Sequence, residues 1–208
     1  IELRGIDGKN VADLTADEAR ELKKLLDSEG IAVWSIGSPI GKVDITSPAE
    51  DELDRFKRVL ETANICGAGN IRMFSFYAPK GEDIHSLRDE AFGAVADMLA
   101  LAKQYGVTLC HENEAKIYGD TPKYCRELLD AFGGELKCVY DMGNFVLERV
   151  DPYPESYELL KKDIAYFHIK DALFAGAIVP PGKGDAKIKE ILDAHKEYSK
   201  ADFFVSLE

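Results

Sequence analysis

The chain has 208 residues, of which 46% are hydrophobic and 31% charged, and its formal net charge is -12. This composition is that of a globular protein with one large core. The negative charge disfavours nucleic acid and anionic membranes as partners, because both are themselves negatively charged. No apolar run approaches the roughly 20 residues that a helix needs to span a bilayer.

The cysteines are separated along the chain and form no C-x-x-C pair. Most of them lie in apolar runs, and no secretory signal precedes them. We therefore expect reduced thiols and a cytoplasmic location. The four residues are Cys66, Cys110, Cys125 and Cys138.

Short apolar runs alternate with longer amphipathic patterns from one end of the chain to the other. Each run has only about four to seven residues, the length expected of buried parallel strands. The expected strands are residues 1–6, 31–37, 70–77, 107–112, 136–142, 164–170 and 202–208.

The amphipathic stretches between these runs predict helices. In the first of them, Thr15 and Glu18 have the spacing of a capping box, and Gly30 is a stop signal. Pro122 occupies a first-turn position in a later helix. The expected helices lie within residues 15–30, 47–67, 85–106, 121–134, 154–163 and 185–200.

Uninterrupted alternation of strands and helices indicates a parallel sheet with helical crossovers. Two α/β architectures agree with it, an open doubly wound sheet and a (β/α)8 TIM barrel. No G-x-G-x-x-G follows a strand, which weakens the dinucleotide-binding version of the open sheet. Because the chain begins and ends within strands, we expect residues 1–208 to form a single, partial TIM-barrel domain that lacks its first β/α unit and its last helix.

Four consecutive expected strands end in side chains that can bind a metal: Glu112, Asp141, His168 and Glu208. In parallel α/β folds, the carboxyl ends of the strands form the site. Taken alone, a strand-end carboxylate is more often a solvated end or a helix cap, and a histidine in an apolar run is more often a core residue. Their joint occurrence favours a site for one divalent cation, Mn²⁺, Mg²⁺ or Zn²⁺.

Around these residues the sequence resembles the xylose-isomerase-like TIM-barrel family, which includes sugar phosphate isomerases and epimerases and AP-endonuclease-2-like proteins. The matching segments are LCHENE (109–114), CVYDMGNF (138–145), YFHIKDA (166–172), PPGKGD (180–185) and VSLE (205–208). The resemblance implies that Glu112, Asp141, His168 and Glu208 bind one divalent metal. It also implies that Glu112 and Glu208 act as the catalytic acid and base, through an enediolate.

Three further residues are candidates for binding the substrate: Lys170, Asn144 and Trp34. Lys170 follows His168 by two positions and can point to the same face of the strand. Asn144 stands where endonuclease members of the family carry a histidine, so a multi-zinc DNA-repair site is not expected. A lone tryptophan such as Trp34 can stack on a sugar, although it more often belongs to the core.

Two other polar residues have structural interpretations. Asp185 matches either a position near the metal or the N-cap of a helix that begins at Ala186. His195 is expected on the surface of the last helix.

The expected activity is therefore a metal-dependent isomerase or epimerase of a sugar, sugar phosphate or related polyol. The alternatives are a dehydratase or lyase of a keto-polyol with the same metal chemistry, and a non-catalytic sugar-binding barrel. The expected partner is a small sugar or polyol, with neither nucleic acid nor membrane. The sequence specifies neither the sugar nor the metal, and it leaves open whether the protein is a homo-oligomer.

Overall fold

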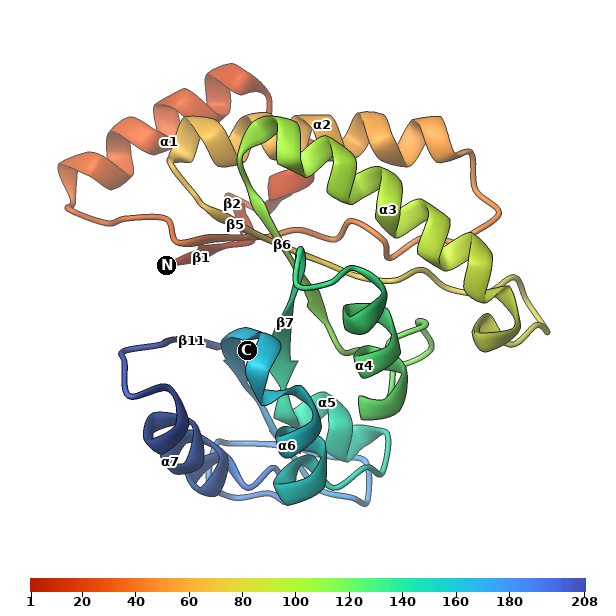
Figure 1. Ribbon diagram of the computed structural model, residues 1–208. Coiled ribbons are helices and arrows are strands. Elements are labelled where there is room, and N and C mark those ends of the chain that lie inside the picture. The colour runs from red at the N-terminus through yellow and green to blue at the C-terminus, as the bar shows by residue number, and fades with distance from the viewer. The chain divides into compact units, whose positions relative to one another are not determined.

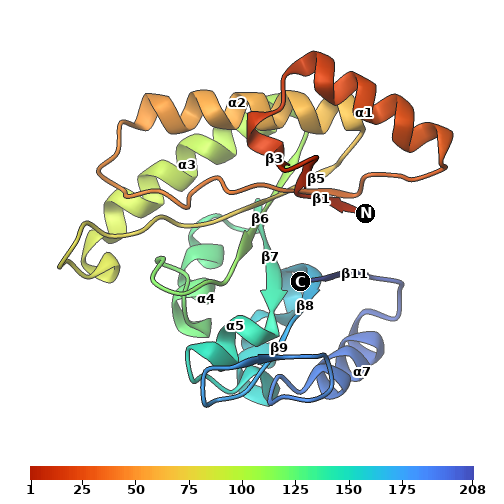
Figure 2. The ribbon, with the colours of Figure 1, turned by 180° about the vertical axis from the view of Figure 1, so that it is seen from behind.

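The computed structural model describes residues 1–208, and the chain divides into two compact units, residues 1–110 and 111–208 (Figures 1 and 2). The strand order is β1-β4-β5-β6 in the first unit and β6-β7-β8-β11 in the second. Strand β6 (Thr108–Glu112) contributes its first three residues to the first unit and its last two to the second.

In the first unit, short parallel strands alternate with three long helices, which lie on one side of the strands in both ribbon views (Figures 1 and 2). A small antiparallel pair, β2 with β3, follows the first strand. The strands are β1 (Glu2–Leu3), β2 (Gly5–Ile6), β3 (Lys9–Asn10), β4 (Ser35–Gly37) and β5 (Asn70–Met73). The helices are η1 (Val11–Asp13), α1 (Ala16–Ser28), α2 (Ala49–Cys66), η2 (Ile84–Leu87) and α3 (Arg88–Tyr105).

Local signals set the limits of these helices. Thr15 accepts a hydrogen bond from the backbone of Glu18, and the Glu18 carboxylate accepts one from the backbone of Thr15, so the predicted capping box is present. Helices α2 and α3 end at Gly67 and Gly106, both of which adopt left-handed backbone angles that favour glycine.

The second unit also alternates strands and helices, but its connections contain more short elements. Its strands besides β6 are β7 (Leu136–Asp141), β8 (Ile164–Ile169), β9 (Asp171–Ala172), β10 (Ile178–Val179) and β11 (Phe204–Leu207). Its helices are α4 (Pro122–Ala131), α5 (Met142–Leu147), η3 (Pro152–Ser156), α6 (Tyr157–Leu160), η4 (Lys161–Asp163) and α7 (Ile188–Ser199).

The register of the parallel strands in the second unit aligns the ends of three chain segments. Asp141 on β7 is the register partner of His168 on β8, and His168 is also the partner of Ser206 on β11. Because side chains alternate faces along a strand, Glu208 lies on the same face as Ser206. The pairing thus brings the carboxyl ends of β7, β8 and β11 to one edge of the unit.

A cluster of buried aromatic side chains packs around Tyr140 of β7. The buried Tyr140 ring makes edge contacts with Phe145, Tyr157 and Phe167, at centroid distances of 5.2, 6.4 and 6.0 Å. Its hydroxyl donates a hydrogen bond to the carbonyl of Pro152 at 2.5 Å, so the buried polar group is satisfied.

Two sequence predictions of elements are wrong in detail. The expected strand 1–6 is divided, because β1 pairs with β4 whereas β2 pairs with β3. The turn from β2 into β3 lies at Asp7 and Gly8, which have positive φ angles. The expected helix 154–163 contains only four α-helical residues, because Tyr153 precedes Pro154 and is extended, which interrupts the helical path at its start. Helix α5 and the hairpin of β9 and β10 were not predicted. No helix in the structure is long and apolar enough to cross a membrane.

Candidate metal centre

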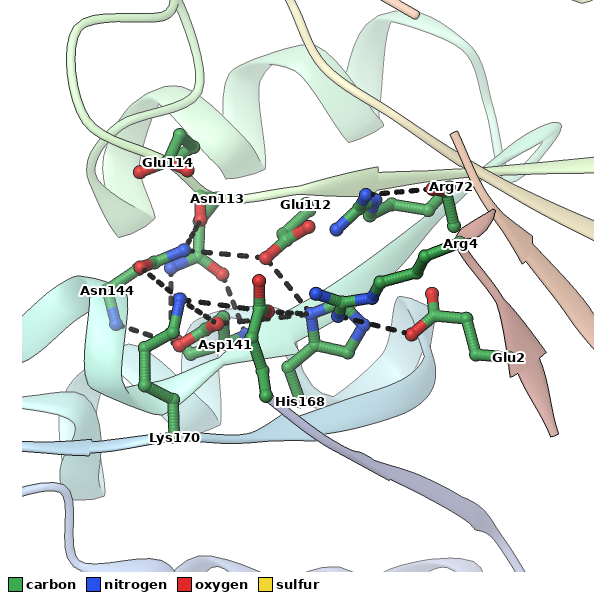
Figure 3. Close-up of polar contacts among 12 residues, drawn as sticks. Glu2, Arg4, Arg72, Glu112, Asn113, Glu114, Asp141, Asn144, His168 and Lys170 are labelled. Carbon is green, nitrogen blue, oxygen red and sulfur yellow. Dashed lines mark hydrogen bonds and ion pairs between the residues drawn. The ribbon is translucent and has the colours of Figure 1, made fainter. Parts of the chain in front are cut away.

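The four side chains predicted at strand ends converge in the second unit (Figure 3). One ligand atom from each of Glu112, Asp141, His168 and Glu208 lies within 4.8 Å of every other. The first three side chains are buried, whereas that of Glu208 is 21% exposed. We call these four residues the carboxylate cluster.

The imidazole of His168 presents the same nitrogen to all three carboxylates. His168 Nδ1 lies 2.7 Å from Glu208 Oε2, 3.0 Å from Glu112 Oε1 and 3.9 Å from Asp141 Oδ2. Three carboxylates around one nitrogen form a site of strong negative potential. Because like charges repel each other in a buried place, such a site needs cations to balance it.

Lys170 supplies one cation at the rim of the cluster. Its ammonium lies 3.2 Å from Asp141 Oδ2 and 3.6 Å from Glu208 Oε2, and it donates a hydrogen bond to Asn144 Oδ1 at 3.0 Å. Burial opposes the charge on Lys170, but the carboxylates of Asp141, Glu208 and Glu112 outweigh it and raise its pKa. Lys170 therefore remains a cation beside the cluster.

Asp141 has one carboxylate oxygen that is ion-paired with Lys170 but accepts no hydrogen bond. Its Oδ1 accepts a hydrogen bond from the backbone N–H of Asn144, whereas its Oδ2 is buried without a hydrogen-bond partner. Burial raises the pKa of Asp141 from 3.8 to about 7, and the neighbouring carboxylates of Glu112 and Glu208 add to the effect. A buried carboxylate oxygen without a hydrogen bond is a suitable ligand for a bound cation, which would supply the interaction that the protein groups do not provide.

Two asparagines hold the carboxylates in place. The side chain of Asn113 donates to the carbonyl of Asp141 at 2.8 Å and accepts from the Asp141 N–H at 2.9 Å, which ties the end of β6 to that of β7 (Figure 3). Asn144 Nδ2 donates to Asn113 O at 2.9 Å and lies 3.4 Å from Glu112 Oε1. Asn113 was missed by the sequence analysis, because an amide carries no metal or acid-base signal there.

The composition of the cluster agrees with a divalent cation. One imidazole and three carboxylates are ligands of Mg²⁺, Mn²⁺ or Zn²⁺, and no thiolate is present in the set. The arrangement can bind such a cation, and its two glutamates can transfer protons to and from a bound molecule.

The remaining candidate residues lie elsewhere. Trp34 is half-buried in the first unit and precedes β4 instead of ending a strand, so its assignment to substrate binding remains a prediction. Asp185 does not cap α7, which begins at Ile188 without a side-chain cap; its carboxylate accepts a hydrogen bond from the N–H of Phe174 instead. His195 is only 5% exposed, so the prediction that it lies on the helix surface is wrong.

Comparison with known proteins agrees with the fold expected from the sequence. A family model described as "Xylose isomerase-like TIM barrel" matches residues 1–208. This match confirms the TIM-barrel fold class and the family resemblance predicted from the sequence. A search of curated proteins found no match.

Solved structures share this fold at low sequence identity. A D-tagatose 3-epimerase-like protein has a TM-score of 0.76 and 18% identity, over 92% of this chain and 76% of its own. The probable 3-DHS dehydratase AsbF of petrobactin synthesis from Bacillus anthracis has a TM-score of 0.75 and 18% identity, over 92% and 75%. The IOLI protein with a binding zinc atom has a TM-score of 0.72 and 18% identity, over 100% and 78%.

Proposed function

Because the chain belongs to the xylose isomerase-like TIM barrel family, we propose that it is a divalent-metal-dependent isomerase or epimerase of a sugar, sugar phosphate or related polyol. The observation that carries the proposal is the convergence of three carboxylates on His168 Nδ1. The epimerase-like structural neighbour supports this class of reaction.

We propose that the four residues of the carboxylate cluster hold the cation. Two observations support this assignment. Asp141 Oδ2 is buried and accepts no hydrogen bond, although it is ion-paired with Lys170, and the cluster offers only nitrogen and oxygen as ligand atoms. The neighbour that is described with a zinc atom supports a metal in a protein of this fold. When bound, the cation would supply Lewis-acid stabilisation of negative charge on the substrate oxygens.

The proposed acid and base are Glu112 and Glu208. One carboxylate removes the proton from a hydroxyl-bearing carbon next to a carbonyl, which gives an enediolate. The other glutamate, as a carboxylic acid, returns a proton to the opposite face of that carbon or to the former carbonyl carbon. Glu112 is held in place by His168 and by the Asn144 amide. Glu208 is more exposed and contacts both His168 and Lys170.

Lys170 and Asn144 are the proposed substrate-binding residues beside this pair. The Lys170 ammonium can donate hydrogen bonds to a substrate oxygen that gains negative charge during proton removal. The Asn144 amide connects that ammonium to Glu112, since its oxygen accepts from Lys170 and its nitrogen lies near Glu112 Oε1.

The test is proton exchange during turnover. The Mn²⁺-loaded protein is incubated in D₂O with a panel of ketoses, their phosphates and keto-inositols, and the products are analysed by NMR and mass spectrometry. An isomerase or epimerase incorporates solvent deuterium and conserves the carbon skeleton and its oxygens. Glu112→Gln and Glu208→Gln should each lose turnover by at least about 100-fold, whereas full activity of either variant with a good substrate would exclude the two-glutamate mechanism.

A second candidate is a metal-dependent dehydratase of a keto-polyol, which the structural likeness to the Bacillus anthracis dehydratase favours. Both reactions begin with proton removal next to a carbonyl, so the site residues are the same. The product distinguishes them, because a dehydratase releases water and lowers the product mass. A non-catalytic sugar-binding barrel predicts saturable binding that a chelator does not change.

A further inference from the structure

The residue that follows Lys170 has a buried carboxylate that the proposed reaction does not use. Asp171 is 2% exposed, and its five hydrogen bonds all come from backbone N–H groups. Its Oδ2 accepts from Gly182, Lys183 and Gly184 at 2.8, 3.0 and 2.9 Å.

The other oxygen continues the same pattern. Asp171 Oδ1 accepts from the N–H groups of Ala172 at 3.0 Å and Ala186 at 3.1 Å. Successive N–H groups that point to one centre form an anion-binding concavity, of the kind that usually receives a phosphate or carboxylate ligand. Here the anion is a side chain of the protein itself, and residues 182–186 wrap around it.

The wrapped segment is shaped to that carboxylate. Gly182 has a φ of +82°, a backbone conformation that side chains rarely adopt. A Cβ at Gly184 would lie 2.2 Å from Asp171 Oδ1 and 2.4 Å from the carbonyl of Ala172. A side chain at either position would therefore disturb the contact between the segment and the carboxylate.

This arrangement also fixes the chain directly after Lys170. Asp171 and Ala172 form β9, which pairs with β10, and the Ala172 carbonyl accepts a further hydrogen bond from Asp185 N–H. On its other side Lys170 packs against Gly143, where even a Cβ would come within 2.6 Å of its Cγ. The backbone of Lys170 is thus held at both sides, and its ammonium reaches the carboxylate cluster.

We infer that Asp171 is a positioning residue. Residues 182–186 fold around its carboxylate, and this contact fixes the chain next to Lys170 and so holds Lys170 beside the carboxylate cluster. The inference deepens the proposed function, because Lys170 is one of its proposed substrate-binding residues. It assigns Asp171 neither contact with substrate nor contact with metal.

The first test measures, by proteolysis, whether residues 182–186 stay folded. Lys183 is exposed, so trypsin can cleave after it once the segment detaches. In the full chain, Asp171→Ala should increase the rate of cleavage at Lys183 by at least about tenfold, measured by mass spectrometry, because unfolded loops are the preferred sites of proteolysis. Asp171→Asn keeps the shape and one acceptor oxygen, and should give an intermediate rate. The matched control is Asp185→Asn, which loses a carboxylate with a single hydrogen bond in the same loop and should have a smaller effect.

Rescue by a small anion separates this role from general destabilisation. Sodium formate, at constant ionic strength, should slow the cleavage of Asp171→Ala and leave the wild-type rate unchanged. The inference is overturned if Asp171→Ala is cleaved at the wild-type rate, or if formate slows its cleavage no more than chloride does.

The second test follows Lys170 through Mn²⁺ affinity, measured by isothermal titration. Lys170→Met should tighten Mn²⁺ binding several-fold, because it removes a positive charge 3.2 Å from Asp141 Oδ2. Asp171→Ala should shift the affinity in the same direction, and the double variant should bind as Lys170→Met does. If the affinity changes of the two single variants simply added in the double variant, the inference that Asp171 acts through Lys170 would be overturned. If the wild type binds no Mn²⁺, the proposed function fails, while the proteolysis and formate results still decide the role of Asp171.

Discussion

A Cβ added at Gly143 would lie 2.6 Å from Cγ of Lys170 and 2.8 Å from its carbonyl oxygen. Gly143 belongs to α5, directly after Asp141, so the helix packs against β8 and its continuation with no space for a side chain. Helix α5 and Lys170, which lies between β8 and β9, are therefore in contact through backbone and aliphatic atoms, and the position of the Lys170 ammonium depends on that contact.

Gly143→Ala should lower the free energy of unfolding by about 1–3 kcal/mol, because an extra methyl group must displace packed atoms. Urea denaturation at neutral pH measures the change. Gly93→Ala in α3 is the matched control, since no atom lies within 4 Å of its added Cβ. That control should be neutral or stabilising by up to about 1 kcal/mol, through helix propensity. Equal stability of the two variants would contradict the packing argument.

His195 is enclosed by aromatic rings. Its Nδ1 lies 3.2 Å from the hydroxyl of Tyr157. Its ring makes edge contacts with Phe167 and Phe203, at centroid distances of 4.8 and 5.0 Å, and a tilted contact with Tyr198 at 6.0 Å. Burial lowers the pKa of His195 from its usual 6.5. The neutral imidazole is therefore part of the folded core.

This burial predicts a loss of stability in mild acid. The unfolded chain takes up a proton on His195 near pH 6.5, whereas the folded protein takes it up only at lower pH, so the free energy of unfolding falls as the pH drops through 6.5. The contribution cannot exceed about 1.4 kcal/mol per pH unit. His195→Gln should flatten the stability curve between pH 7 and 5.5 in urea titrations, and His85→Gln serves as the control. A curve of unchanged slope in His195→Gln would contradict the prediction.

Burial should also make the cysteines unreactive. None of the four forms a disulfide, all are buried, and burial raises the pKa of Cys66 and of Cys125. Since the thiolate is the reactive form, the folded protein should react with a disulfide reagent at least about tenfold more slowly than the denatured chain. The absorbance of the thiolate that the reagent releases measures this reaction rate. If the folded protein reacted as fast as the denatured chain, the prediction would be wrong and the core would open readily.

The strand ends were predictable because their chemistry is visible in the sequence. Glu112, Asp141 and His168 each end an apolar run, and parallel strands bring their carboxyl ends together. The hydrogen bonds that hold the cluster were not predictable. An asparagine such as Asn113 has no periodic or chemical signature, and its partners on Asp141 are 28 residues away.

His195 shows a second limit of the sequence. It lies one helical turn after the buried Ile191, but a histidine at that position is compatible with surface or core. The rings of Phe167 and Phe203, which belong to other segments of the chain, determine its burial. Tertiary contacts of this kind leave no pattern within the helix itself.

Asn113 should be as important for stability as for the site. Asn113→Ala leaves the buried N–H and carbonyl of Asp141 without their partners, which should cost about 1–3 kcal/mol of unfolding free energy. If the cluster binds Mn²⁺ as proposed, the substitution should also weaken that binding by about 10–100-fold, the usual effect of removing a group that orients a metal ligand. Asn64→Ala, on the exposed face of α2, should change stability by less than about 0.5 kcal/mol. Unchanged Mn²⁺ affinity in Asn113→Ala would show that Asp141 does not need this support.

Glu112 and Glu114 provide a matched pair for testing the proposed metal site, since they are two residues apart and differ in surroundings. Glu112 is buried against His168, whereas Glu114 accepts a hydrogen bond from the adjacent Ala115 N–H. If the cluster binds Mn²⁺, saturation at 100 times the dissociation constant should stabilise the wild type by about 2.7 kcal/mol, and a chelator should reverse the gain. Glu114→Gln should keep this stabilisation, and Glu112→Gln should lose most of it. A metal-dependent shift in melting temperature that is the same in both variants would place the cation elsewhere, because only Glu112 lies within ligand distance of the other three side chains.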